Sequence, residues 1–301
     1  MRKLPVIRSV SEVFSGVTRH YFELLGVAAF PILATLVVIM LSGFLLWDTD
    51  LARWYMTLAS QPTGGEPPLP PSDPGAWMLV FVSVVLIGLL FAACAVRWHR
   101  FVLLGERPGA GGAPLAIWRG EDGRYVITIL KLSLVMAFAM IPVMAGSAIA
   151  GYISNGGEGT GFGALGAILF LGIFLLLMLL FVRISIALPD AALGGRGSVR
   201  ATFSRTEGNS WRLLGYNFLV QLVLMVISLV YSLLLMLVIA ALFSDRTGTG
   251  ATLTSVLLNI PMYLYSSMVG VTMLSVAYRE IVGLPGGHEG EATAAEPSPG
   301  L

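Results

Sequence analysis

The chain of 301 residues has little charge and almost no cysteine. Charged residues make up 12% of the sequence, whereas they make up roughly a quarter of an ordinary soluble domain. Cys94 is the single cysteine, which excludes an intrachain disulfide and a thiolate metal cluster built from this chain alone. Together with 56% hydrophobic residues and a mean hydropathy of +0.84, these shortages indicate that lipid surrounds most of the chain.

Long apolar runs account for most of the length. A helix needs about 20 apolar residues to cross a hydrocarbon core of about 30 Å, and backbone groups in lipid must pair within their own segment. The predicted spans are residues 24–46, 77–96, 127–152, 164–182, 213–243 and 253–278. We therefore expect an all-α membrane protein in which residues 1–282 form six transmembrane helices arranged as three hairpins. Residues 283–301 are rich in Gly, Glu, Ala and Pro and are expected to be a disordered tail.

The basic residues fall on alternate sides of these runs. Of the 18 Lys and Arg residues, all but Arg53 and Arg246 lie on one side. The positive-inside rule then places both termini in the cytoplasm. We expect a multi-pass protein of a bacterial inner membrane, and the net charge of +1 gives no indication of a nucleic-acid partner.

Two basic segments are related at an offset of 189 residues. The matching residues are Ser9-Val10, Phe14-Ser15 and Leu24-Leu25-Gly26 in the first copy, and Ser198-Val199, Phe203-Ser204 and Leu213-Leu214-Gly215 in the second. In the first copy, Ser9 and Glu12 have the spacing of a capping box, and apolar residues at helical spacing predict an amphipathic helix on the cytoplasmic membrane surface. Residues 115–119 and 124–125 resemble a degenerate third copy, so we expect each hairpin to be led by an interfacial helix.

The densest cluster of reactive side chains follows the second span, where Trp98, His99 and Arg100 precede Glu106. Acid–base or phosphate chemistry could use such residues. One His beside one Glu lacks the spacing of a zinc-binding helix, and Trp and Arg are common at membrane interfaces. We therefore expect lipid-headgroup or interfacial contacts from Trp98, His99 and Arg100, with no catalytic residue and no metal.

The spans lack Asp and Glu near mid-depth, and ion-coupled transport usually needs such charges. Their most polar positions are Asn217 and Gln221 in the fifth span and Asn259 and Tyr263 in the sixth. These residues either line a polar path for a substrate or hydrogen-bond neighbouring helices.

One stretch matches a dinucleotide-binding pattern in letters only. Residues 161–166 have the form G-x-G-x-x-G, but neither a preceding strand nor an acidic residue about twenty positions on accompanies them. We expect no cofactor there and interpret these glycines as a loop followed by a helix face of small residues.

Residues 183–189 and 204–214 carry a further pattern. They read Arg-Ile-Ser-Ile-Ala-Leu-Pro and Ser-Arg-Thr-Glu-Gly-Asn-Ser-Trp-Arg-Leu-Leu. The pattern resembles the R-x-S-x-A-L-P and T-x-G-N-x-W-R signature of a bacterial six-span family, which includes the membrane region fused to some glycerophosphodiester phosphodiesterases. The resemblance implies no catalytic residues, because in those enzymes the active site belongs to a soluble domain. On physical grounds, Arg183, Trp211 and Arg212 are expected at the lipid headgroups.

These observations favour a non-enzymatic inner-membrane protein with an accessory or scaffold role connected with the envelope or with membrane lipids. Its expected partners are membrane lipids, preferentially anionic ones. Two alternatives remain open at this stage. One is a transporter or lipid-translocating protein that uses spans five and six, and the other is a lipid-modifying enzyme built around His99, Arg100 and Glu106. The sequence does not indicate a protein partner or an oligomeric state.

Overall fold

The computed structural model describes residues 3–60, 68–106, 118–156, 160–243 and 248–284. Within these residues, six helices are long and apolar enough to cross a membrane. They are α2 (Tyr21–Leu46), α4 (Pro74–Leu104), α5 (Gly120–Gly156), α6 (Thr160–Ser185), α9 (Ser210–Leu242) and α10 (Thr249–Ile281). The described part of the chain contains no strand, and the predicted all-α, six-span membrane fold is confirmed. The predicted tail, residues 283–301, lies almost wholly outside the described residues.

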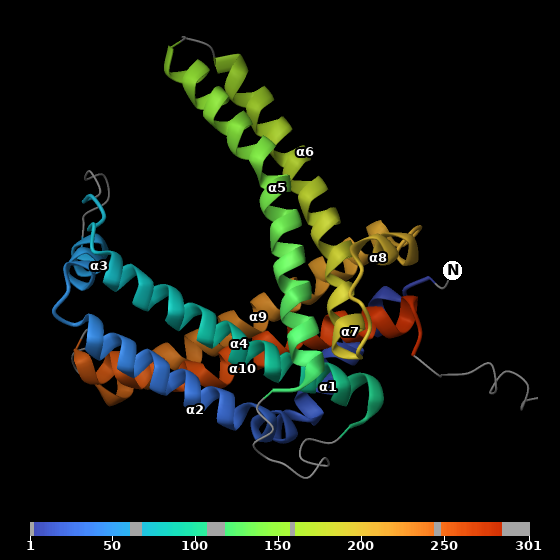
Figure 1. The fold of residues 1–301 in the computed structure, drawn as a ribbon, viewed down its shortest axis with the longest axis horizontal. Coiled ribbons are helices and arrows are strands. Elements are labelled where there is room, and N and C mark those ends of the chain that lie inside the picture. The colour runs from blue at the N-terminus through green and yellow to red at the C-terminus, as the bar shows by residue number, and fades with distance from the viewer. Residues whose placement is uncertain (1–2, 61–67, 107–117, 157–159, 244–247, 285–301) are drawn as a thin grey trace, which may run out of the picture.

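Consecutive spans pack against each other as three hairpins, α2 with α4, α5 with α6, and α9 with α10 (Figure 1). Four short helices accompany them: α1 (Val6–Arg19), α3 (Asp50–Ser60), α7 (Ala187–Ala192) and α8 (Val199–Arg205). Helices α1, α7 and α8 gather at one end of the molecule, together with the last turns of α4, α6 and α10. We call this the basic end, because the basic segments of the sequence converge there.

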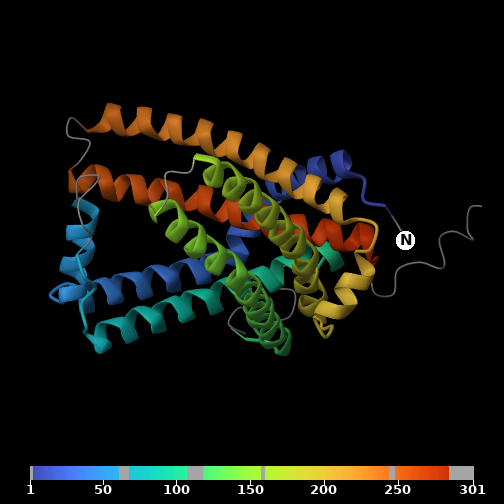
Figure 2. The ribbon, with the colours of Figure 1, turned by 90° about the horizontal axis from the view of Figure 1, so that it is seen from above.

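The α5–α6 hairpin diverges from the other spans. Helices α2, α4, α9 and α10 run side by side, whereas α5 and α6 rise away from them and meet them near the basic end (Figures 1 and 2). Helix α1 crosses α10 and packs against both α9 and α10 near the basic end (Figure 1). The outer halves of the spans therefore pack less closely than their basic ends.

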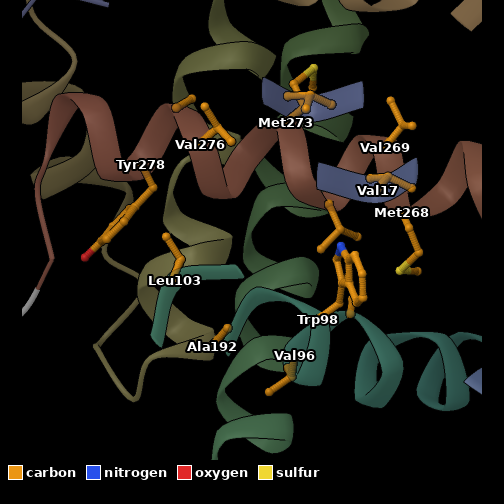
Figure 3. Close-up of a cluster of buried hydrophobic side chains, with 14 of the residues drawn as sticks. Val17, Val96, Trp98, Leu103, Ala192, Met268, Val269, Met273, Val276 and Tyr278 are labelled. Atoms are coloured by element: carbon orange, nitrogen blue, oxygen red, sulfur yellow. The ribbon is translucent and has the colours of Figure 1, made fainter. Parts of the chain in front are cut away.

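The buried core accordingly sits at the basic end. Figure 3 shows part of it, where Trp98 from α4 points towards α10 and lies near Val17 of α1. Farther along the spans most large apolar side chains are exposed, as Leu233 of α9 is at 55%. Such exposure suits a surface that faces acyl chains rather than water.

Local sequence determines where α4 begins and ends. Helix α4 starts at Pro74, whose missing N–H costs nothing in a first turn, and the Asp73 carboxylate accepts hydrogen bonds from the Gly75 and Ala76 amides at 2.9 and 3.2 Å. It ends at Gly105, which has a positive φ of 69°, a conformation that glycine adopts without a Cβ clash. The span is thus extended eight residues past the predicted end at residue 96.

Helix α1 differs from its prediction in two respects. It begins at Val6 rather than at Ser9, which is a buried residue inside the helix. The predicted capping box at Ser9 and Glu12 is therefore wrong. Its apolar face, with Val13 and Val17 both 0% exposed, packs on α9 and α10 rather than on a lipid surface.

The two segments related at an offset of 189 residues keep the same alignment in the structure. Helix α2 begins at Tyr21 and α9 begins at Ser210, so both spans start at equivalent positions, each preceded by a break and a short helix. Leu24 and the equivalent Leu213 are both buried, at 0% and 1% exposure. In the second copy Ser198 does cap its helix, because its hydroxyl accepts the Ala201 amide at 3.4 Å. Of the third copy, residues 115–117 lie outside the described part, and 124–125 belong to α5.

Helix α3 lies between the first two predicted spans, where the sequence analysis predicts no helix. Its Leu51 is buried at 1% exposure, and the Trp54 indole donates to the Pro68 carbonyl at 2.8 Å and lies 6.2 Å from the ring of Trp77. The spacing of Leu51, Trp54 and Leu58 is the helical signal that could have predicted it.

Candidate functional site

His99 is wholly enclosed where α4, α5 and α10 meet. Its Nδ1 atom lies 2.7 Å from Ser275 Oγ and its Nε2 atom 3.3 Å from the Tyr125 hydroxyl. The single hydroxyl hydrogen of Ser275 is donated to the Val271 carbonyl at 3.0 Å. With the hydroxyl used in this way, His99 Nδ1 is the donor to Ser275 and Nε2 is the acceptor from Tyr125. The three side chains form one directed chain of hydrogen bonds in which a neutral imidazole is fully satisfied.

Trp98 is buried beside it. Its indole Nε1 donates to Thr272 Oγ1 at 2.7 Å, and its exposed fraction is 1%, against 0% for His99. The expectation that these two residues contact lipid headgroups is therefore wrong. The reason is that α4 continues to Leu104, so that both side chains lie on its inner face against α10.

Arg100 and Glu106 form an ion pair on the outside of the same helix end. The guanidinium donates to both carboxylate oxygens, at 2.9 and 2.6 Å, and also to the Ala192 carbonyl at 3.3 Å. This pairing holds the pKa of Glu106 below its usual value. The sequence cluster thus separates, because His99 points into the bundle while Arg100 and Glu106 bind each other and the end of α7.

Arg183 connects α6 to α8. Its Nε donates to Thr206 Oγ1 at 3.0 Å, its Nη2 to the Phe203 carbonyl at 2.6 Å, and its guanidinium lies 4.3 Å from the centre of the Phe203 ring. Arg279 at the end of α10 binds Glu12 of α1 in a corresponding way. In both cases an arginine at the end of one hairpin holds the short helix that leads into another.

Residues 206–212 bind the N-terminal segment. Asn209 Oδ1 accepts the Leu4 amide at 3.1 Å, and Arg212 Nη1 donates to the Leu4 carbonyl at 3.2 Å. Gly208 supplies a positive φ of 74° at the break between α8 and α9. Trp211, by contrast, is 67% exposed. Most of these signature residues therefore join α6, α8, α9 and the N-terminal segment, whereas Trp211 projects outwards.

Asp190 is a connecting residue that the sequence analysis missed. Its Oδ1 accepts hydrogen bonds from Arg205 at 3.0 Å and from the Tyr278 hydroxyl at 3.2 Å, and its Oδ2 accepts the Gly197 amide at 3.1 Å. The signal was available, since Asp190 follows Pro189 directly and is an acidic residue within a basic segment. An acidic residue in such a setting is an expected partner for arginine.

The four polar residues of spans five and six do not converge on one site. Asn259 Nδ2 donates to the Ser255 carbonyl of its own helix at 2.8 Å, and Tyr263 is 69% exposed. Asn217 is half-buried and Gln221 is exposed. The side chains of residues 147–167, including the glycine pattern at 161–166, lie outside those that the structure describes.

In the described residues, no group of three or more His, Cys, Asp and Glu side chains could hold a metal ion. Comparison with family models, with curated proteins and with solved structures finds no match. The resemblance to the bacterial six-span family therefore stays a prediction from the sequence. What the geometry itself displays is a set of arginine-centred contacts that hold helices together at the basic end.

Proposed function

We propose that this multi-pass membrane protein is a non-enzymatic accessory or scaffold protein that binds anionic phospholipids through its basic end. The main support for the proposal is that the arginines of the basic end fall into two groups, one that binds other helices and one that is exposed. Arg183 and Arg279 are half-buried and hold helices, whereas Arg8, Arg196 and Arg200 are exposed at the same end. Exposed arginines at a membrane surface attract anionic headgroups by about 1 kcal/mol each.

Two exposed tryptophans support the proposal that the basic end contacts lipid headgroups. Trp118 and Trp211 are 48% and 67% exposed and lie at the basic ends of α5 and α9. Indole rings favour the headgroup level of a bilayer. Under the positive-inside rule the basic end faces the cytoplasm of a bacterial inner membrane, where anionic lipids and this surface would meet.

The test uses the full chain in nanodiscs. Replacing Arg8, Arg196 and Arg200 together by Gln removes three exposed charges and, at about 1 kcal/mol each, should weaken binding of phosphatidylglycerol by on the order of 100-fold. Native mass spectrometry of the retained lipid measures the change, and Arg53→Gln at the opposite end is the control. Equal retention of phosphatidylglycerol and phosphatidylcholine by the unaltered protein would contradict the proposal.

The enzyme alternative has weaker support, because His99 does not meet Arg100 and Glu106 in one place. It would regain support if the purified protein turned over a lipid and both His99→Gln and Glu106→Gln abolished the turnover. In that case the accessory role would be wrong.

Gln221 supports the translocation alternative. It lies nine residues after Arg212, which is about half a turn round a helix, so it faces away from the N-terminal segment that Arg212 binds. An exposed amide at this depth is costly in lipid, so movement of a labelled lipid between leaflets that Gln221→Leu abolishes would favour this function.

A further inference from the structure

An apolar groove lies among α2, α4 and α10, away from the polar contacts of the basic end. Its volume is about 440 Å³. The residues that line it are Ala28, Pro31, Ile32, Thr35, Leu36, Ile39, Ile87, Phe91, Cys94, Val256, Ile260, Tyr263, Leu264, Ser267 and Met268. None of them is charged, and most present only carbon atoms. We call this the α2–α4–α10 groove.

The groove has the length of one leaflet of acyl chains. On α2 it runs from Ala28 to Ile39 and on α10 from Val256 to Met268, which at about 1.5 Å per residue is about 16 to 18 Å. Half of a hydrocarbon core is about 15 Å thick. One extended acyl chain therefore fits the groove end to end.

The position of the groove along the helices selects one leaflet. Ile39 and Val256 each lie seven residues from the helix end opposite the basic end, Leu46 in α2 and Thr249 in α10. That distance is about 10 Å, which is the depth at which headgroups give way to hydrocarbon if the helix ends reach the headgroup layer. The other end of the groove is closed by Met268, which is 0% exposed and belongs to the buried core.

We propose that the α2–α4–α10 groove binds one acyl chain of a phospholipid from the leaflet opposite the basic end. The ester end of the chain lies near Ile39 and Val256, and the terminal methyl lies near Cys94 and Met268. A channel of this volume inside a bilayer is filled by hydrocarbon, because water would find no polar partners there. Three helices enclose the chain, whereas an ordinary boundary lipid touches one face. This site is independent of the anionic-lipid surface at the basic end.

The experiment uses phospholipids that carry a photoactivatable diazirine on the acyl chain. The full-length protein is reconstituted in vesicles that contain a small fraction of either of two probes, one with the diazirine beside the ester and one with it at the terminal methyl. After irradiation, adducts are mapped by mass spectrometry. The ester-proximal probe should label residues near Ile39 and Val256, and the methyl-terminal probe should label residues near Cys94 and Met268.

Filling the groove provides the matched comparison. Thr35→Phe and Ser267→Phe place a ring in the groove from α2 and α10, and each should lower groove labelling by on the order of tenfold, as expected when about two methylene groups lose their contacts. Val37→Phe and Leu257→Phe add the same ring at positions 63% and 60% exposed that do not line the groove. These two controls should leave labelling unchanged.

Three outcomes would overturn the proposal. Adducts spread evenly over all exposed apolar faces would mean boundary lipid only. Groove labelling that survives Thr35→Phe and Ser267→Phe together would mean that the chain lies elsewhere. Probe positions reversed along the helices would assign the lipid to the other leaflet. The variant with Arg8, Arg196 and Arg200 replaced should keep the same groove labelling even if it loses its preference for phosphatidylglycerol. Groove binding and anionic-lipid binding at the basic end can therefore be contradicted independently.

Discussion

At the scale of single residues, the hydrogen bonds from Tyr125 through His99 to Ser275 show how a buried histidine can have a structural role. Each ring nitrogen of His99 has one partner, and the Ser275 hydroxyl also bonds to the Val271 carbonyl of its own helix. This chain of hydrogen bonds links α5, α4 and α10 at the place where the diverging hairpin meets the remaining spans. Breaking it should therefore loosen the attachment of that hairpin.

The corresponding prediction concerns Tyr125→Phe, which removes only the hydroxyl that donates to His99 Nε2. A buried acceptor left without a partner costs about 1 to 3 kcal/mol, so the variant should unfold at a lower temperature in detergent. Tyr55→Phe is the control, because Tyr55 is 50% exposed. Equal unfolding temperatures for Tyr125→Phe and the unaltered protein would show that the hydrogen bond does not contribute.

At the scale of elements, the recurring unit is a short helix, a break and a span. The break before α9 depends on Gly208 and its φ of 74°. The break before α2 falls at His20, which is equivalent to Asn209 before α9. The two copies differ in length, because α1 has 14 residues and α8 has 7. Their shared register means that the break, rather than the short helix, sets where each span begins.

Two glycine substitutions on the same segment test this role and should act in opposite directions. Gly208→Ala meets no atom within 4 Å, so its cost is the left-handed backbone alone, roughly 1 to 2 kcal/mol. Gly215→Ala also meets open space, but it lies inside α9 and should stabilise the helix by about 0.5 to 1 kcal/mol. Thermal unfolding of both variants in one detergent measures the difference. Two shifts of the same sign would mean that the break does not depend on Gly208.

At the scale of the whole molecule, the orientation in the membrane is the property most open to a direct check. In a Cys94→Ala background, Ser72→Cys and Ser204→Cys each place one thiol at an exposed position, on opposite ends of the molecule. An impermeant thiol reagent added to intact cells should label the variant at position 72 and leave the one at 204 unlabelled. The converse pattern would place the basic end outside.

Much of the architecture could be predicted because bilayer thickness restricts the length of each span, so the run from 213 to 243 and α9 at Ser210–Leu242 almost coincide. The surroundings of Trp98 and His99 could not, since composition alone does not tell which face of a helix end meets a neighbour. Their positions in α4, past the predicted end of the span, were the missing information. Residues Arg183 and Asn209 were recognised as a pattern, but their partners are distant in sequence.

The closure of the N-terminal segment onto the C-terminal spans has a consequence for biogenesis. Leu4 binds Asn209 across 205 positions and Glu12 binds Arg279 across 267. Because a chain is made from its N-terminus, α1 is synthesised before either of its main partners, α9 and α10. Until α10 has inserted, the apolar face around Val13 and Val17 lacks part of the native surface that covers it, so insertion of α10 completes this contact.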